Sequence, residues 1–214
     1  MGVLGRAYEY AMANWDALLT ALQQHLWLVA VPLVVGLLLG LPLGLWSARS
    51  PAVSAVLINS FNALRVIPSL AILFLAIPYF GLSFQSAAIA LTLLVMPPIL
   101  ISTDVAFRTI DPMIREAAHG MGMSPVQVLQ QVEFPLALPV MIAGIKTALV
   151  EVIASATLAA FIGAGGLGTF VVRGFALYDS AILLVGAVPV ALLALAAELG
   201  MSALQKLAQP PTKN

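Results

Sequence analysis

Long apolar runs constrain the fold of this chain more than any other feature of its sequence. Runs of about 20 residues rich in Leu, Ala and Val recur along the chain, and an α-helix needs about that length to cross a bilayer. Of the 214 residues, 62% are hydrophobic and 8% are charged, whereas soluble domains average about 25% charged residues. In lipid only helices or closed barrels satisfy the backbone, and unalternating runs predict helices. The expected fold class is therefore an all-α integral membrane protein.

The apolar runs divide into about five predicted transmembrane helices. A proline breaks the second span near Pro68, and further prolines predict kinks in the third and fifth spans. In the first span Gly36, Gly40 and Gly44 recur at every fourth position, which predicts close packing against another helix. The five spans cover approximately residues 26–46, 53–80, 87–107, 140–162 and 180–204.

The segment before the first span predicts a separate amphipathic element. Residues 3–22 place apolar side chains, Tyr8 and Trp15 among them, at helical spacing, a pattern that suits a helix lying in the membrane interface. A simple lead-in to the first span is the alternative. The expected organisation is an N-terminal segment over residues 1–24, a transmembrane domain over 25–208 containing a cytoplasmic loop at 109–136, and a tail over 209–214.

The distribution of basic residues predicts the orientation in the membrane. An odd number of spans puts the two termini on opposite sides. With the loop at 109–136 inside, the basic side chains divide five to two in favour of the cytoplasm, as the positive-inside rule requires. The N-terminus is then outside and the C-terminus inside. The inner residues are Arg49, Arg108, Arg115, Lys206 and Lys213, and the outer ones are Arg6 and Arg173.

The polar interruption between spans three and four carries the signals of two short helices. Asp111 followed by Pro112 predicts a helix N-cap with proline at the first helical position. Gly120 and Gly122 predict the end of this first helix. An ordinary connector between two spans is the alternative reading.

A second helix is predicted directly after these glycines. Ser124 is placed to cap it, and Gln127 stands at the capping-box position. Pro135 and Pro139 are expected to end this second helix.

This interruption resembles the EAA loop of the membrane subunits of ABC importers. The resemblance rests on Glu116-Ala117-Ala118, on Gly122 six positions after the glutamate, and on Val132-Glu133-Phe134-Pro135. The family pattern has isoleucine and leucine where Val132 and Phe134 stand, so the apolar character is kept while the shape differs. It implies that the segment docks on a separate cytoplasmic ATPase, with Glu116 as a polar anchor. The remaining implied docking residues are Ala117, Ala118 and Gly122 for close approach, Met121 and Met123 as adaptable apolar contacts, and Ser124 and Pro135.

Further segments resemble the permeases of osmoprotectant importers, which carry glycine betaine, choline, carnitine or proline betaine. These segments are Arg65–Ala71, Pro135–Pro139, Thr157–Ala160 and Gly163–Gly168. Methionine-importer permeases share the glycine-rich turn and remain an alternative. The resemblance implies a type I ABC importer (MetI-like) architecture in a prokaryotic inner membrane. Its implied partners are ATPases that hold ATP and magnesium, an extracytoplasmic substrate-binding protein, a second permease copy or paralogue, and membrane lipid.

The sequence offers no catalytic, nucleotide or metal site. No P-loop occurs, so this chain is not expected to hydrolyse ATP or to carry a cofactor. Both histidines lack a partner at metal-ligand spacing, and a net charge of zero without a basic block argues against nucleic acid as a partner. Gly163, Gly165 and Gly168 match a dinucleotide-binding pattern, but no βαβ unit surrounds them. We therefore expect Gly163 to Gly168, including Gly166, to form a tight turn.

Glu151 lies near the middle of the fourth span, where a carboxylate must face protein or water. It is expected to line the translocation path or a subunit seam, where Arg65 is a candidate partner and Ser155 lies on the same small-residue face. A structural hydrogen bond to a neighbouring helix is the alternative. Lys146 lies nearer the inner end, where it can snorkel. Arg65 and Glu151 also leave open a third reading, in which the chain is a stand-alone channel or secondary carrier.

Overall fold

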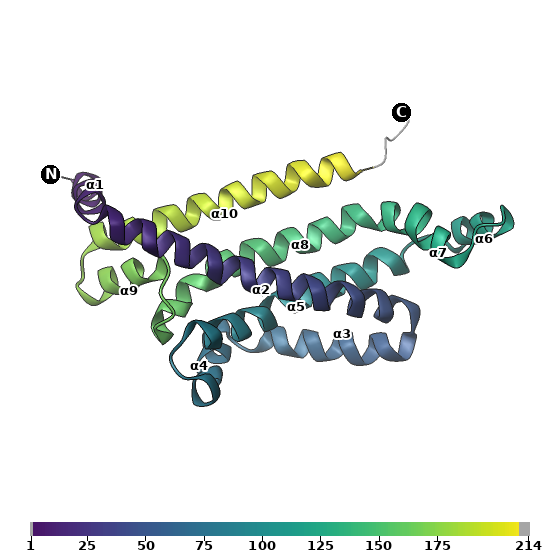
Figure 1. The fold of residues 1–214 in the computed structure, drawn as a ribbon, viewed down its shortest axis with the longest axis horizontal. Helices are drawn as coiled ribbons and strands as arrows, with labels where there is room; N and C mark the ends of the chain where they lie inside the picture. The colour runs from purple at the N-terminus through teal and green to yellow at the C-terminus, as the bar shows by residue number, and fades with distance from the viewer. Residues whose placement is uncertain (1, 210–214) are drawn as a thin grey trace.

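The computed structural model describes residues 2–209, and this part of the chain is helical throughout its regular elements. The helices form an elongated bundle, with α1 across one end and α6 and α7 projecting from the other (Figure 1). A π-helical segment (Val128–Glu133) precedes α8, and a 3-10 segment (Thr157–Ile162) follows it. The α-helices are α1 (Val3–Ala13), α2 (Trp15–Arg49), α3 (Pro51–Val66), α4 (Ser69–Phe80), α5 (Phe84–Arg108), α6 (Pro112–Gly120), α7 (Pro125–Gln127), α8 (Phe134–Ala156), α9 (Gly168–Ala176) and α10 (Ser180–Ala208).

Four helical segments in the described residues are long and apolar enough to cross a membrane, and a bent pair brings the number to as many as five. The four are α2, α5, the continuous segment Pro125–Ile162 that contains α7 and α8, and α10. The pair is α3 and α4, which meet at an angle of 97°. The prediction of about five transmembrane helices is confirmed, because the bent pair supplies the span that Pro68 was expected to break.

Helix α5 forms the centre of the bundle. It packs on α2 and α8 along most of its length and on α3 and α4 at its sides. Its apolar side chains, including Leu91, Val95 and Ile99, are buried in a core shared with α2, α4 and α8. The helices at the periphery, by contrast, keep large apolar side chains exposed, such as Leu38 of α2 and Leu192 of α10.

The glycines of the first span lie against α5, as their spacing predicted. Gly36, Gly40 and Gly44 are all buried in α2. A Cβ atom added to Gly44 would lie 2.6 Å from Cβ of Thr103 and 2.7 Å from the carbonyl oxygen of Leu100. Small residues let two helix backbones approach closely, which is a main source of helix association where lipid removes the hydrophobic driving force.

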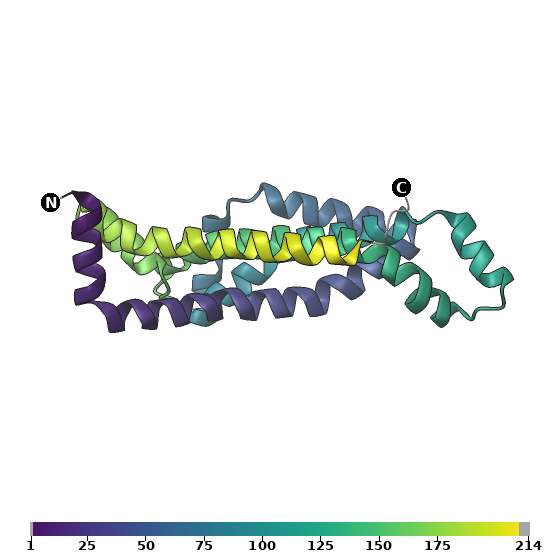
Figure 2. The ribbon, with the colours of Figure 1, turned by 90° about the horizontal axis from the view of Figure 1, so that it is seen from above.

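The beginning of the chain differs from the predicted single helix over residues 3–22. The helix breaks at Asn14, whose side chain amide donates to the carbonyl oxygen of Tyr10, so α1 runs across the start of α2 (Figure 2). Residues 15–22 belong to α2, and of their side chains Leu18, Ala21 and Leu22 pack in a cluster with residues of α9 and α10. Tyr10 and its neighbouring alanines pack against α9 and α10, while Leu4 and Tyr8 point outward.

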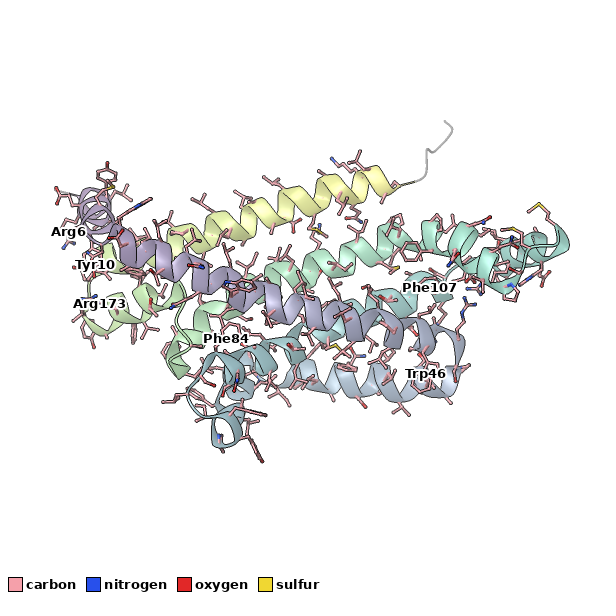
Figure 3. The ribbon with its side chains drawn as sticks, viewed as in Figure 1. Arg6, Tyr10, Trp46, Phe84, Phe107 and Arg173 are labelled. Atoms are coloured by element: carbon pink, nitrogen blue, oxygen red, sulfur yellow. The ribbon has the colours of Figure 1, made fainter. Side chains whose placement is uncertain are left out.

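Two arginines and a tyrosine gather at the end of the bundle that carries α1. Arg6, Tyr10 and Arg173 lie together where α1 meets α9, and Phe107 lies toward the opposite end (Figure 3). The guanidinium of Arg173 lies 6.0 Å from the centre of the Tyr10 ring, within the range of a cation–π interaction.

The prediction that Pro135 and Pro139 end the second short helix is wrong. Pro135 stands in the first turn of α8 and Pro139 inside it, so the chain stays helical from Pro125 to Ile162. The π-helical segment explains the continuity at Pro135, because the amide of Phe134 donates to the carbonyl oxygen of Leu129, five residues back. The wider turn accommodates a proline ring that has no amide to donate and would press on an α-helical carbonyl.

Helix α9 lies between the glycine-rich turn and Asp179, in a stretch that the five predicted spans leave without a helix. This helix buries Phe170 and two glycines against the 3-10 segment and α10. It is too short to have been recognised as a span, and its helicity depends on that packing. The predicted tail over 209–214 and Lys213 lie outside the described residues, apart from Gln209.

We expect Gly44→Ala to destabilise the bundle by about 1–3 kcal/mol, because the added methyl group overpacks the contact with α5. Gly200→Ala in α10 is the matched control, since nothing lies within 4 Å of an added Cβ there. Thermal or denaturant unfolding of the purified protein in detergent measures the difference. Equal stability of the two variants would contradict the close packing of α2 on α5.

Candidate functional site

Helices α6 and α7 extend beyond the bundle at the end opposite to α1 (Figures 1 and 2). Asp111 caps α6 by accepting a hydrogen bond from the amide of Met113 at 2.9 Å. At the other end, the amide of Gly122 donates to His119 and the amide of Met123 donates to Ala118. This is the Schellman pattern, which needs the left-handed backbone that Gly122 adopts at φ +83°.

The second short helix begins as its sequence predicted. Oγ of Ser124 accepts from the amide of Gln127, and the side chain of Gln127 accepts from the amide of Ser124 at 2.8 Å. Both halves of the capping box are therefore formed. Together the two caps define the turn between α6 and α7 without help from another protein.

Most of the predicted docking residues lie on the outer surface of this projection. Met121 is 75% exposed, and Met123 is half-buried. Ala118 is only 2% exposed, so its small side chain packs within the chain and lies beneath this outer surface. The exposed members of the set are Glu116, Ala117, Met121, Gly122, Ser124 and Pro135.

The projection is attached to the bundle through the carboxylate of Glu133. This side chain is 1% exposed and accepts hydrogen bonds from Arg49 and Arg115. Nε of Arg115 lies 2.6 Å from Oε1 of Glu133, and its guanidinium also donates to the carbonyl oxygen of Phe107. The ends of α2 and α5, the helix α6 and the π-helical segment thus meet at one ion-pair cluster. A buried carboxylate requires such partners, because desolvation without them is costly.

A second ion-pair cluster lies at the same end of the bundle. Asp104 of α5 is buried and accepts from Oγ of Ser47 at 2.6 Å and from Arg108 at 2.6 Å. Arg108 also donates to Oγ of Ser54 in α3. From the sequence, Arg49, Arg108 and Arg115 indicate only the orientation in the membrane, and Asp104 has no predicted role. The spacing of Asp104 and Arg108, one helical turn apart, was the available signal for this pair.

The three residues predicted for the translocation path line one cavity. Arg65, Glu151 and Ser155 surround a volume of about 280 Å³. The break between α3 and α4 forms one wall of the cavity, and α5 and α8 form the others. In residues 2–209, neither Arg65 nor Glu151 forms an ion pair. Lys146 instead donates to Glu198 of α10 at 2.8 Å. Of these two charged residues of α8, Lys146 therefore has an ion-pair partner and Glu151 has none in the described residues.

The glycine-rich stretch forms the tight turn that was expected. Gly163, Gly165 and Gly166 all have positive φ, and the amide of Gly166 donates to Oε1 of Gln24 at 3.0 Å. The neighbouring His25, which the sequence reading treated as isolated, is fully buried with Nε2 3.2 Å from the carbonyl oxygen of Ile153. No periodicity signalled these contacts, because they join α2 to segments more than a hundred residues away.

The sequence matches the family described as "Binding-protein-dependent transport system inner membrane component" over residues 40–210. Among similar proteins, the carnitine transport permease protein OpuCB of Listeria monocytogenes is 40% identical over 192 residues, which cover 90% of this chain and 88% of that protein. The osmoprotectant import permease protein OsmW of Salmonella typhimurium is 36% identical over 207 residues, 94% and 96% of the two chains. These relatives are therefore similar along nearly their whole length.

A similar structure has also been solved. A chain of the MetNI methionine ABC transporter in an inward-facing conformation aligns with a TM-score of 0.81, covering 92% of this chain and 99% of that one. The sequence identity of 22% limits this likeness to the fold. The expected MetI-like architecture is thereby confirmed.

We expect Glu133→Gln to loosen the projection, because two arginines would lose their anionic partner. Removing one member of a buried ion pair costs about 3–5 kcal/mol, so the amides of α6 should exchange with deuterium at least tenfold faster in the purified protein. Glu116→Gln, which changes an exposed carboxylate of the same segment, is the control. If both variants exchange at the wild-type rate, Glu133 does not hold the projection in place.

Proposed function

The chain belongs to the family of inner membrane components of binding-protein-dependent transport systems, and from this membership we propose that it is the permease of an importer for small osmoprotectants. Its solutes in this proposal are glycine betaine, carnitine or choline. The names of the relatives carry the proposal: several that match nearly the whole chain at 33–40% identity are permeases for these solutes. Permeases of this family are transport components and not enzymes.

The two alternatives have weaker support. The likeness to the methionine transporter concerns the fold alone, so it does not favour methionine as the solute. A stand-alone channel or secondary carrier does not fit a family of components that act with a separate binding protein.

The partners follow from the proposed machine. A cytoplasmic ATPase, which holds the ATP and magnesium, docks on α6 and α7, with Glu116, Ala117, Met121 and Gly122 at the contact. The exposed position of this projection supports the assignment, since helix docking into a groove requires an accessible apolar and small-residue surface. Flexible methionine side chains suit such a contact. A substrate-binding protein delivers the solute at the opposite end of the bundle.

The proposed arrangement in the membrane places the projection in the cytoplasm. Arg49, Arg108 and Arg115 all lie at that end of the bundle, in agreement with the positive-inside rule. The N-terminus is then outside and the C-terminus inside. Exposed leucines on α2 and α10, such as Leu38 and Leu199, face lipid or the second permease chain, which is either another copy or a paralogue.

We expect Gly122→Val to abolish solute uptake and to reduce co-purification of the ATPase at least tenfold, while membrane insertion is retained. A β-branched side chain at positive φ disturbs the turn and adds bulk at the docking surface. Gly81→Val is the matched control, because Gly81 also has positive φ and open space around an added Cβ but lies away from the projection. Normal ATPase binding by the Gly122 variant would show that the partner docks elsewhere.

Competition for uptake by the reconstituted importer tests the solute class. Excess glycine betaine, carnitine or choline should reduce uptake of labelled glycine betaine to less than a tenth, whereas methionine should leave it unchanged. Competition by methionine alone, with methionine imported in place of betaine, would favour the methionine alternative.

A further inference from the structure

We propose that the cavity between Arg65 and Glu151 is a transient solute subsite for a small zwitterion, and that Arg65 passes the solute to a second cavity farther along α8. Arg65 binds the carboxylate of the solute, and Glu151 faces its cationic group. This inference rests on the proposed import function and adds to it a binding site within the membrane domain.

The first argument is the contrast between these two charges and the other charged groups of the bundle. Asp104 and Glu133 have arginine partners, and Lys146 has Glu198. Arg65 and Glu151 form no ion pair in the described residues, although they line the same cavity. An unpaired charge within membrane-spanning helices is expensive and marks solute paths more often than structural joints. Two such charges of opposite sign match a solute that carries both signs.

The second argument is the broken span. The cavity is lined by Val66, Ile67, Pro68 and Ser69, the residues at which α3 ends and α4 begins. No side chain caps the N-terminus of α4, so its first amides and the positive end of its helix dipole are available at the cavity. Half-helix N-termini in transporters are directed at anionic groups of the solute. The carboxylate is therefore favoured on the side of the cavity that holds Arg65.

The third argument is a second cavity that shares Arg65. It has a volume of about 330 Å³ and is lined by Val140, Ala143, Gly144 and Thr147 of α8, together with residues of α5. These positions lie between Glu151 and the projecting end of the bundle. Arg65 lines both cavities, so a solute moving along α8 keeps contact with the guanidinium as it leaves Glu151.

The size of the first cavity agrees with a solute of a few heavy atoms. Its volume of about 280 Å³ is slightly below the range of about 300–1,000 Å³ that holds drug-sized ligands. A solute with only a positive charge would still meet Glu151 but would gain nothing from Arg65. Glycine betaine and choline therefore form a matched pair of probes, because both carry a trimethylammonium group and only the former has a carboxylate.

The test uses the complete importer, with its ATPase and binding protein, in proteoliposomes at saturating solute. Each rate is divided by the wild-type rate for the same solute, which removes the preference of the binding protein. Arg65→Gln should reduce uptake of glycine betaine at least tenfold and change uptake of choline less than threefold. Glu151→Gln should reduce both at least tenfold. Arg65→Lys, which keeps the charge, should restore betaine uptake to within about threefold of wild type.

The control is the double variant Lys146→Gln with Glu198→Gln, which removes a paired charge from the same helix and should leave both rates within threefold. Co-purification of the ATPase confirms that each variant assembles. Equal losses for betaine and choline in Arg65→Gln, or betaine uptake within threefold of wild type, would overturn the subsite.

The proposed function fails separately, if the wild-type importer takes up neither solute. The dependence of uptake on a solute carboxylate is then measured with an amino acid that the importer does take up and with the corresponding amide, which lacks the carboxylate. Equal losses of uptake for these two solutes in Arg65→Gln would overturn the subsite. If the wild-type importer takes up glycine betaine but not choline, betaine uptake by Arg65→Gln is compared with betaine uptake by Arg65→Lys. Equal uptake by these two variants would overturn the subsite.

Discussion

A carboxylate that is fully buried in the bundle needs partners to replace the water it has lost, and this constraint organises the structure. Glu133 lies between Arg49 and Arg115, and this cluster makes the projecting helices continuous with the spans behind them. Asp104 plays the same part for α2, α3 and α5 through its neighbouring serines and Arg108. Each of these carboxylates joins helices that are distant in sequence, because side chains from other helices replace part of the water it has lost.

Close backbone contact provides the rest of the cohesion. The glycines of α2 bring its backbone against α5, and Gly144 brings α8 against a neighbouring face of the same helix, where an added Cβ would collide with the side chain of Ser102. Gly168 allows α9 to begin directly against the carbonyl of Thr157. In lipid, an apolar side chain gains little free energy by moving from the acyl chains to a helix interface. Close backbone contacts and interhelical hydrogen bonds therefore replace the hydrophobic effect as the source of helix association.

The same structure leaves two features open to other molecules. One is the projection of α6 and α7, which is capped at both turns and so keeps its shape while its outer residues stay exposed. The other is the cavity at the break between α3 and α4, where irregular backbone lies beside the unpaired Arg65 and Glu151. Irregular backbone within a bilayer is tolerated where it borders a cavity. The π-helical segment before Pro135 runs from the projection into α8, which also lines that cavity, so one continuous helical path connects the two features.

The sequence by itself determined the helical class, the approximate spans, the caps at Asp111 and Ser124 and the tight glycine turn. These features depend on composition, on helical spacing and on hydrogen bonds between residues a few positions apart, all of which can be read along the chain. Only the tertiary structure decided that Ala118 is buried, that Pro135 begins a helix and that residues 168–176 form α9. It also decided that Glu133 meets its two arginines and that Asp104 meets serines of α2 and α3. Those outcomes depend on contacts between segments far apart in sequence, and a buried charge chooses its partner by proximity in space, which no local pattern specifies.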